Sequence, residues 1–168
     1  MEKVAQFMKV SLKEYQKAMK ANFNYTDDEI KEMYNNIILP KRATIGSAGY
    51  DFKIPFPLII KPNETILIPT GIRVKMYEGF VLLIFPRSGL GFKYRLQLNN
   101  TIGVIDSDYF NSDNEGHIMI KVTNDTNENK TIELKNNQGI CQGIFIPFAI
   151  TVDDEVTNVR NGGFGSTN

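Results

Sequence analysis

IRVKMYEGFVLLIF, residues Ile72–Phe85, holds two β-rich runs, Ile72–Met76 and Phe80–Phe85, separated by the turn signal Tyr-Glu-Gly. Further short β-rich runs with turn residues between them recur on both sides, from residue 48 to residue 148. They are Phe52–Ile54, Leu58–Ile60, Thr65–Ile68, Ile102–Ile105, His117–Val122, Thr131–Leu134 and Ile140–Phe148. Because so many short strands follow one another at this spacing, the sequence predicts an all-β fold of the barrel or sandwich type.

The first forty residues have a different pattern. Residues 4–10 are predicted to form a short strand. Ser11-Leu-Lys-Glu and Thr26-Asp-Asp-Glu then each fit a capping box, in which a hydroxyl satisfies a helix N–H and the glutamate reaches back. Apolar residues at helical spacing follow both, so we predict helices at roughly 12–22 and 27–36, ended by Pro40. Each is too short to be stable alone in water, and we expect both to pack either on the barrel of their own subunit or on a neighbouring subunit.

Composition limits the classes of function. The 168 residues include 19 basic and 19 acidic residues, so the net charge is zero. Non-specific binding to nucleic acid would favour a basic excess, and no nucleic-acid partner is expected. Cys141 is the one cysteine, which excludes an intrachain disulfide. No run of about 18 apolar residues occurs. We expect a single domain over residues 1–168, no membrane association and a cytoplasmic location.

Two segments offer groups for chemistry. Pro86-Arg87-Ser88-Gly89-Leu90-Gly91 could be a loop whose guanidinium, hydroxyl and N–H groups bind phosphate, or an ordinary strand-ending turn. Residues 103–109 run from an apolar strand into Asp106, Asp108 and Tyr109. A carboxylate at a strand end can deprotonate or orient a water molecule, although a solvated Asp-Ser-Asp turn is the alternative. A calcium-binding EF-hand loop is rejected, because Phe110 and Asn111 occupy positions that need a ligand and a glycine.

The C-terminal segment combines an arginine, an aromatic residue and several glycines. Arg160 precedes Gly162, Gly163, Phe164 and Gly165. Glycine hinges with a charge for phosphate and a ring for stacking are typical of a mobile lid, here about residues 158–168. A frayed terminus is the alternative.

Five short motifs, in this order, resemble those of the trimeric dUTPase family. The resemblance covers about residue 39 to the C-terminus. The motifs are Ala48-Gly49-Tyr50-Asp51, Pro86-Arg87-Ser88-Gly89, Gly103-Val104-Ile105-Asp106-Ser107-Asp108-Tyr109, Gly139-Ile140-Cys141-Gln142 and Gly163-Phe164-Gly165-Ser166-Thr167.

The resemblance implies a β-barrel-like jelly roll, with the residue 12–36 helices as an insertion, and a homotrimer with three shared active sites. One subunit would supply the first, second and fourth motifs, another the third and the remaining one the last. The implied activity is Mg²⁺-dependent hydrolysis of dUTP to dUMP and pyrophosphate, which removes dUTP and supplies dUMP for dTTP synthesis.

The resemblance also implies roles for individual residues. Asp106 would be the general base for in-line attack of water on the α-phosphorus. Asp51 would act on Mg²⁺ through a water molecule, and the triphosphate would hold most of the metal's coordination. The implied substrate contacts are Arg87, Ser88, Gly89 and Gln142 with the phosphates, Asn100 and Gly103 with uracil, and Tyr109 under the deoxyribose. Phe164 would stack on uracil, while Arg160, Gly165, Ser166 and Thr167 would close over the phosphates.

The sequence departs from the family pattern in four places. The fourth motif usually reads Gly-Asp-Arg-x-x-Gln, whereas here Gln138 stands in place of the acid that would orient Arg87. The last motif is one residue shorter. Residues 12–36 and about 111–115 are insertions.

Two other functions are alternatives on the same fold, and two isolated residues have purely structural interpretations. A dCTP deaminase would need a glutamate where Lys121 stands. A catalytically silent trimeric regulatory or binding protein on the same fold is the second alternative, against which the presence of Asp106 and Tyr109 argues. His117 is expected to be a strand-end residue and Cys141 a small buried hydrophobe.

Overall fold

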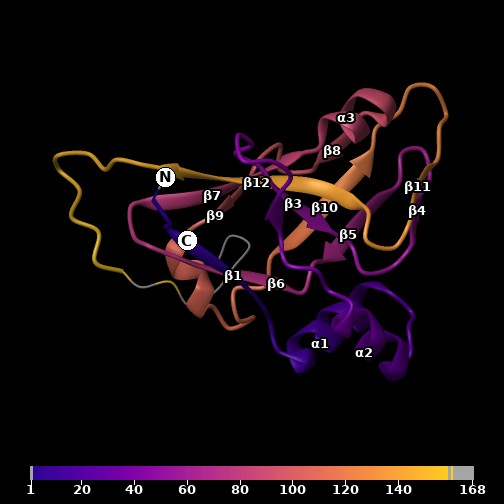
Figure 1. Cartoon of the computed structure of the whole chain (residues 1–168), viewed down its shortest axis with the longest axis horizontal. Helices are drawn as coiled ribbons and strands as arrows, with labels where there is room; N and C mark the ends of the chain where they lie inside the picture. Colours follow the sequence, from indigo (N-terminus) through magenta and orange to yellow (C-terminus); the bar gives the residue numbers. More distant parts are fainter. Residues whose placement is uncertain (1, 159, 161–168) are drawn as a thin grey trace.

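The structure, a computed structural model, describes residues 2–158 and 160 and is built mainly of antiparallel strands (Figure 1). Its largest sheet has the order β2-β3-β12-β7-β9. These strands are Lys41–Arg42 (β2), Tyr50–Lys53 (β3), Phe80–Pro86 (β7), Gly103–Ile105 (β9) and Gly139–Pro147 (β12). This architecture confirms the predicted all-β class.

The other strands form three smaller antiparallel sheets, ordered β5-β10-β8, β1-β6 and β11-β4. Their bounds are Ala5–Lys9 (β1), Leu58–Ile60 (β4), Thr65–Pro69 (β5), Ile72–Met76 (β6), Leu96–Leu98 (β8), Met119–Asn124 (β10) and Ile132–Leu134 (β11). Alternation of buried and exposed residues, as along β4 and β11, places one face of these strands in the core. Each predicted strand is present, and β2 and β8 are additional.

Helices α1 (Leu12–Asn22) and α2 (Asp27–Asn35) confirm the two predicted helices. Both halves of the capping box are formed at Thr26 and Glu29. At the first helix the prediction was half wrong. The Ser11 hydroxyl accepts from the Glu14 N–H, but Glu14 does not reach back to Ser11. The Ser11 N–H instead donates to Glu115 at 2.7 Å.

The two helices lie together beside the strands (Figure 1) and their apolar faces enter the main core. Tyr15, Met19 and Ile30 are fully buried, and burial of an apolar side chain such as Met19 or Ile30 contributes about 1.5–3 kcal/mol. Gly71, between β5 and β6, allows the close approach. It has φ +70, and a Cβ there would lie 2.3 Å from Ile37 Cδ1. The helices are therefore packed on the barrel of their own chain, which is the first of the two expected alternatives.

The loop predicted after Pro86 is in fact a short helix, α3 (Ser88–Tyr94), with Arg87 at its N-cap. Leu90 is buried and Tyr94, one turn later, packs against the core. This apolar pair at i and i+4 favours helix where two glycines disfavour it. The predicted end of the second helix near residue 36 is confirmed, because the C-cap of α2 is Asn36, four residues before Pro40.

No helix within residues 2–158 is both long and apolar enough to cross a membrane.

Candidate functional site

Three strands of the largest sheet bring the first, second and fourth motifs together. In the antiparallel register, Gln142 of β12 pairs with Asp51 of β3 on one side and with Phe85 of β7 on the other. Arg87 and Ser88 follow directly after β7. A cavity of about 210 Å³ opens between them, which we call the Arg87 pocket. It is lined by Ala43, Ser47, Gly49, Asp51, Arg87, Ser88 and Gln142.

Arg87 is oriented by Asp51 and by the backbone of β12. Its Nε lies 3.2 Å from Asp51 Oδ1. A Cβ on Gly139 would lie 2.3 Å from Arg87 Nη1, so the guanidinium lies directly over that glycine. Gln138 is engaged elsewhere, since its Oε1 accepts from the Lys135 N–H at 3.0 Å. The missing acid at position 138 is thus not needed to hold Arg87 in place.

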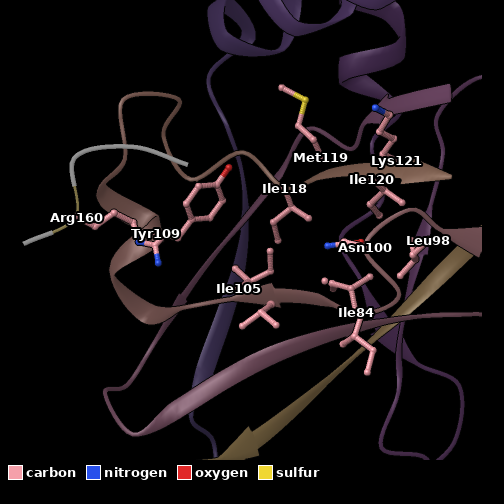
Figure 2. A pocket seen from close by; sticks show the side chains of 13 residues that line it. Ile84, Leu98, Asn100, Ile105, Tyr109, Ile118, Met119, Ile120, Lys121 and Arg160 are labelled. Carbon is pink, nitrogen blue, oxygen red and sulfur yellow. The ribbon is translucent and has the colours of Figure 1, made fainter. Parts of the chain in front are cut away.

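A second cavity, of about 250 Å³, lies between β9 and β10, and we call it the Tyr109 pocket. In Figure 2, Tyr109 and Arg160 lie at one end and Asn100 toward the other, with Ile105 and Ile118 between them. Its lining is Ile84, Leu98, Asn100, Ile102, Gly103, Val104, Ile105, Tyr109, Ile118, Met119, Ile120, Lys121 and Arg160. A mostly apolar wall with a few polar groups suits a planar base and a sugar.

Asp106 lies at the end of β9, where the strand passes into the 3₁₀ helix η1 (Ser107–Asn111). Arg160 donates from Nη2 to Asp106 Oδ2 at 2.5 Å and from Nε to Asp108 Oδ1 at 2.9 Å. Its guanidinium also lies 6.0 Å from the centre of the Tyr109 ring. Arg160 therefore contacts the third motif of its own chain, and its contact with the phosphates of the substrate stays a prediction.

Tyr109 is buried and its hydroxyl is fully engaged. The hydroxyl donates to the His117 carbonyl at 2.8 Å and accepts from Asn114 Nδ2 at 2.8 Å. Burial raises the pKa of Tyr109, an effect that the Asn114 hydrogen bond partly offsets. Tyr109 therefore presents a neutral ring to the cavity and does not exchange a proton.

Sequence reasoning missed the supporting roles of His117 and Asn114. His117 does precede a strand, as predicted, but it is fully buried, and burial lowers its pKa to about 4. The sequence does contain a sign of these roles, a single histidine beside apolar strand residues, because a buried polar ring needs hydrogen-bond partners. The prediction for Cys141 is confirmed, since the thiol is buried and burial raises its pKa.

The Arg87 and Tyr109 pockets share no lining residue. One chain therefore collects the predicted phosphate-binding residues in one place and Asp106, Asn100, Gly103 and Tyr109 in another. Phe164, Gly165, Ser166 and Thr167 lie outside the described residues, as does most of the predicted lid.

Oxygen atoms suited to Mg²⁺ are present in the Arg87 pocket. Asp51, Ser88 and Gln142 supply carboxylate, hydroxyl and amide oxygens, the hard ligands that this ion prefers. Among residues 2–158 and 160, no three histidine, cysteine or acidic side chains gather as a metal-binding group. This donor set fits a hydrated ion with few direct protein ligands.

Comparison with known proteins gives consistent findings. The dUTPase family model matches residues 35–168. Deoxyuridine 5'-triphosphate nucleotidohydrolase from Lactococcus lactis is 42% identical over 144 residues, which cover 83% of this chain and 95% of that protein. The crystal structure of dUTPase from Streptococcus mutans has a TM-score of 0.64 and 36% identity, covering 86% of this chain and 97% of the other. A structure of Staphylococcus bacteriophage 80alpha dUTPase with dUPNHPP has a TM-score of 0.62 and 21% identity, covering 99% of each chain.

Proposed function

The chain belongs to the dUTPase family and is a dUTP diphosphatase, and we propose that it cleaves dUTP by in-line attack of a water molecule that Asp106 activates. The water oxygen bonds to the α-phosphorus and its proton passes to the Asp106 carboxylate. The bond from the α-phosphorus to the bridging oxygen breaks, and pyrophosphate leaves. The position of Asp106 at the end of β9, directly after Ile105 of the Tyr109 pocket, carries this assignment because a general base must be fixed in its orientation.

The Arg87 pocket takes the triphosphate. Arg87, Ser88, Gly89 and Gln142 are the contacts, and the Asp51 carboxylate presets the direction of the Arg87 guanidinium. A guanidinium fixed in this way loses less conformational entropy on binding an anion. Mg²⁺ held mainly by the triphosphate would neutralise the charge that develops on the phosphates, and Asp51 would contact its hydration shell through a water molecule.

The Tyr109 pocket takes the nucleoside. Asn100 and the backbone at Gly103 bind the uracil edge, and the Tyr109 ring packs under the deoxyribose. Because the Tyr109 hydroxyl is bonded on both sides, the ring cannot withdraw to admit a 2′-hydroxyl. Phe164, Gly165, Ser166 and Thr167 follow Arg160 and close the site.

Assembly as a homotrimer completes each active site. One chain holds the two pockets apart, so the Arg87 pocket of one subunit meets the Tyr109 pocket of another. Large apolar side chains remain exposed at the edge of β9 and beyond β12, which suits burial against other subunits. They include Val104 at 58% and Ile150 at 70% exposure.

Pyrophosphate release from dUTP, dCTP, dTTP and UTP by the purified protein tests this function. Fast release from dUTP alone is expected. Release of ammonia from dCTP would support the deaminase alternative, against which Lys121 argues. Tight nucleotide binding with no turnover would support the silent binding protein.

A further inference from the structure

Glu115 joins the segment that follows Tyr109 to the start of helix α1. Its carboxylate accepts from the Ser11 N–H at 2.7 Å and from the Ser11 hydroxyl at 2.6 Å. Glu115 has φ +59, a left-handed conformation that is costly for a residue with a Cβ. The backbone keeps this conformation because contacts on both sides hold it.

Arg73 of β6 holds the other end of the same segment. It donates to the Phe110 carbonyl at 2.6 Å, and its guanidinium lies 3.6 Å from the centre of the Phe110 ring. Its Nη1 is also 4.0 Å from Glu115 Oε2. Burial alone would raise the pKa of Glu115, but the Ser11 hydrogen bonds and the nearby charge of Arg73 lower it below the ordinary value. Glu115 is therefore an anion fixed between the insertion and the barrel.

His117 makes a second connection between helix α1 and the Tyr109 segment. Its Nε2 accepts from the Gly71 N–H at 2.9 Å, so Nδ1 carries the proton and faces Glu14 Oε1 at 3.3 Å. The carbonyl of this same residue accepts from the Tyr109 hydroxyl. The position of the His117 carbonyl thus depends on Glu14 of the N-terminal insertion. The position of the Tyr109 ring in the pocket depends on it in turn.

We propose that Glu14 and Glu115 are positioning residues for Tyr109, through which the N-terminal insertion sets the selectivity for deoxyribose over ribose. The inference rests on the proposed role of Tyr109 under the sugar. It gives the insertion a functional part beyond the packing role that its sequence predicts. Figure 2 shows the Tyr109 ring at the end of the pocket, where a small displacement changes the space left for a sugar.

Glu115→Ala tests the proposal, with Ser11→Ala as a second variant that removes the hydroxyl's hydrogen bond to Glu115 and keeps the one from the Ser11 N–H. Both should lower the ratio of kcat/KM for dUTP to that for UTP by about three- to tenfold, because the freed segment lets Tyr109 recede. Glu115→Gln keeps an oxygen that accepts from Ser11 and should largely restore the ratio.

Glu29→Ala is the matched control. Glu29 also accepts from the hydroxyl and the N–H of a helix cap residue, Thr26, both at 2.7 Å, but it lies away from Tyr109. Its loss should lower Tm to a similar extent and leave the ratio unchanged.

The position of Tyr109 can be followed directly by NMR with ¹³Cζ-labelled tyrosine, the signal being identified by its loss in Tyr109→Phe. It should move in Glu115→Ala and not in Glu29→Ala. An unmoved signal, or an equal change of ratio in the control, overturns the proposal.

If Tyr109→Ala lowers the ratio and Glu115→Ala does not, the inference fails while the proposed role of Tyr109 stands. A flat ratio in Tyr109→Ala removes that role and this inference with it.

Discussion

At the scale of single residues, the sequence motifs suggest which residues form the proposed site, but several of the partners of these residues could not be predicted. The motif containing Arg87 indicates a phosphate contact. Nothing local to it shows that Asp51, 36 positions earlier in the chain, holds the guanidinium at 3.2 Å. The contact depends on the register of β3 against β12, which a chain pattern does not specify. The sequence therefore left open what orients Arg87 without an acid at position 138, whereas the structure places Asp51 beside the guanidinium.

Asp106→Asn should lower kcat by about 10²–10⁴ while dUTP binding is retained, because an amide keeps the shape of the side chain but accepts no proton from water. Single-turnover kinetics and calorimetric titration would measure the two quantities separately. Asp108→Asn is the control, since Asp108 also contacts Arg160 but is not the proposed base. Near-normal turnover in Asp106→Asn, with a large loss in the control, would move the base to Asp108.

Gln138→Ala should change stability by about 1 kcal/mol or less and leave kcat unchanged, because the side chain accepts one hydrogen bond, from Lys135, in an exposed turn. Steady-state kinetics and a thermal melt would check this. A collapse of activity would show that the amide orients Arg87 during the reaction.

At the scale of elements, strands with turn signals on both sides were predictable and short elements stabilised by distant contacts were not. The pattern gave β4 and β6 at their observed bounds, because apolar periodicity and turn residues agree there. Helix α3 was missed, since two glycines in seven residues disfavour helix and only the burial of Leu90 compensates for them. The partner of Ser11 was also missed, because Glu115 lies 104 positions away.

His117 should make stability depend on pH. Its ordinary pKa is 6.5, and burial lowers it to about 4 in the folded protein. Between these values the unfolded chain binds a proton that the folded one does not. The contribution of His117 to the free energy of unfolding is thus complete above pH 6.5 and is lost as the pH falls toward 4. The full shift corresponds to roughly 3 kcal/mol. Burial also raises the pKa of Glu14, which acts in the opposite sense and offsets part of the loss.

His117→Gln removes the titrating ring, so its Tm should fall less steeply than that of the wild type between pH 7 and pH 5. Calorimetric melts at half-unit intervals would compare the two slopes. Equal slopes would mean that other groups cause the acid instability.

At the scale of the whole molecule, the residues of the proposed active site lie around two pockets of the chain that share no lining residue. The Arg87 pocket lies among β3, β7 and β12, whereas the Tyr109 pocket lies between β9 and β10. A reaction that needs Asp106 beside a phosphate held by Arg87 must therefore join two copies of the chain. Symmetric closure of such heterologous contacts gives a ring, and the proposed trimer has three equivalent sites.

Mixed trimers test this arrangement without a structure of the assembly. Arg87→Ala and Asp106→Asn homotrimers should each be nearly inactive. If the two variants are unfolded, mixed in equal amounts and refolded, subunits combine at random. A site then receives an intact Arg87 from one subunit and an intact Asp106 from another in about one case in four. About a quarter of wild-type activity should return, as measured by pyrophosphate release.

Mixing without unfolding is the control and should restore little, because stable trimers exchange subunits slowly. If refolded mixtures stay as inactive as their parents, both groups act within one chain, and the shared-site arrangement is wrong.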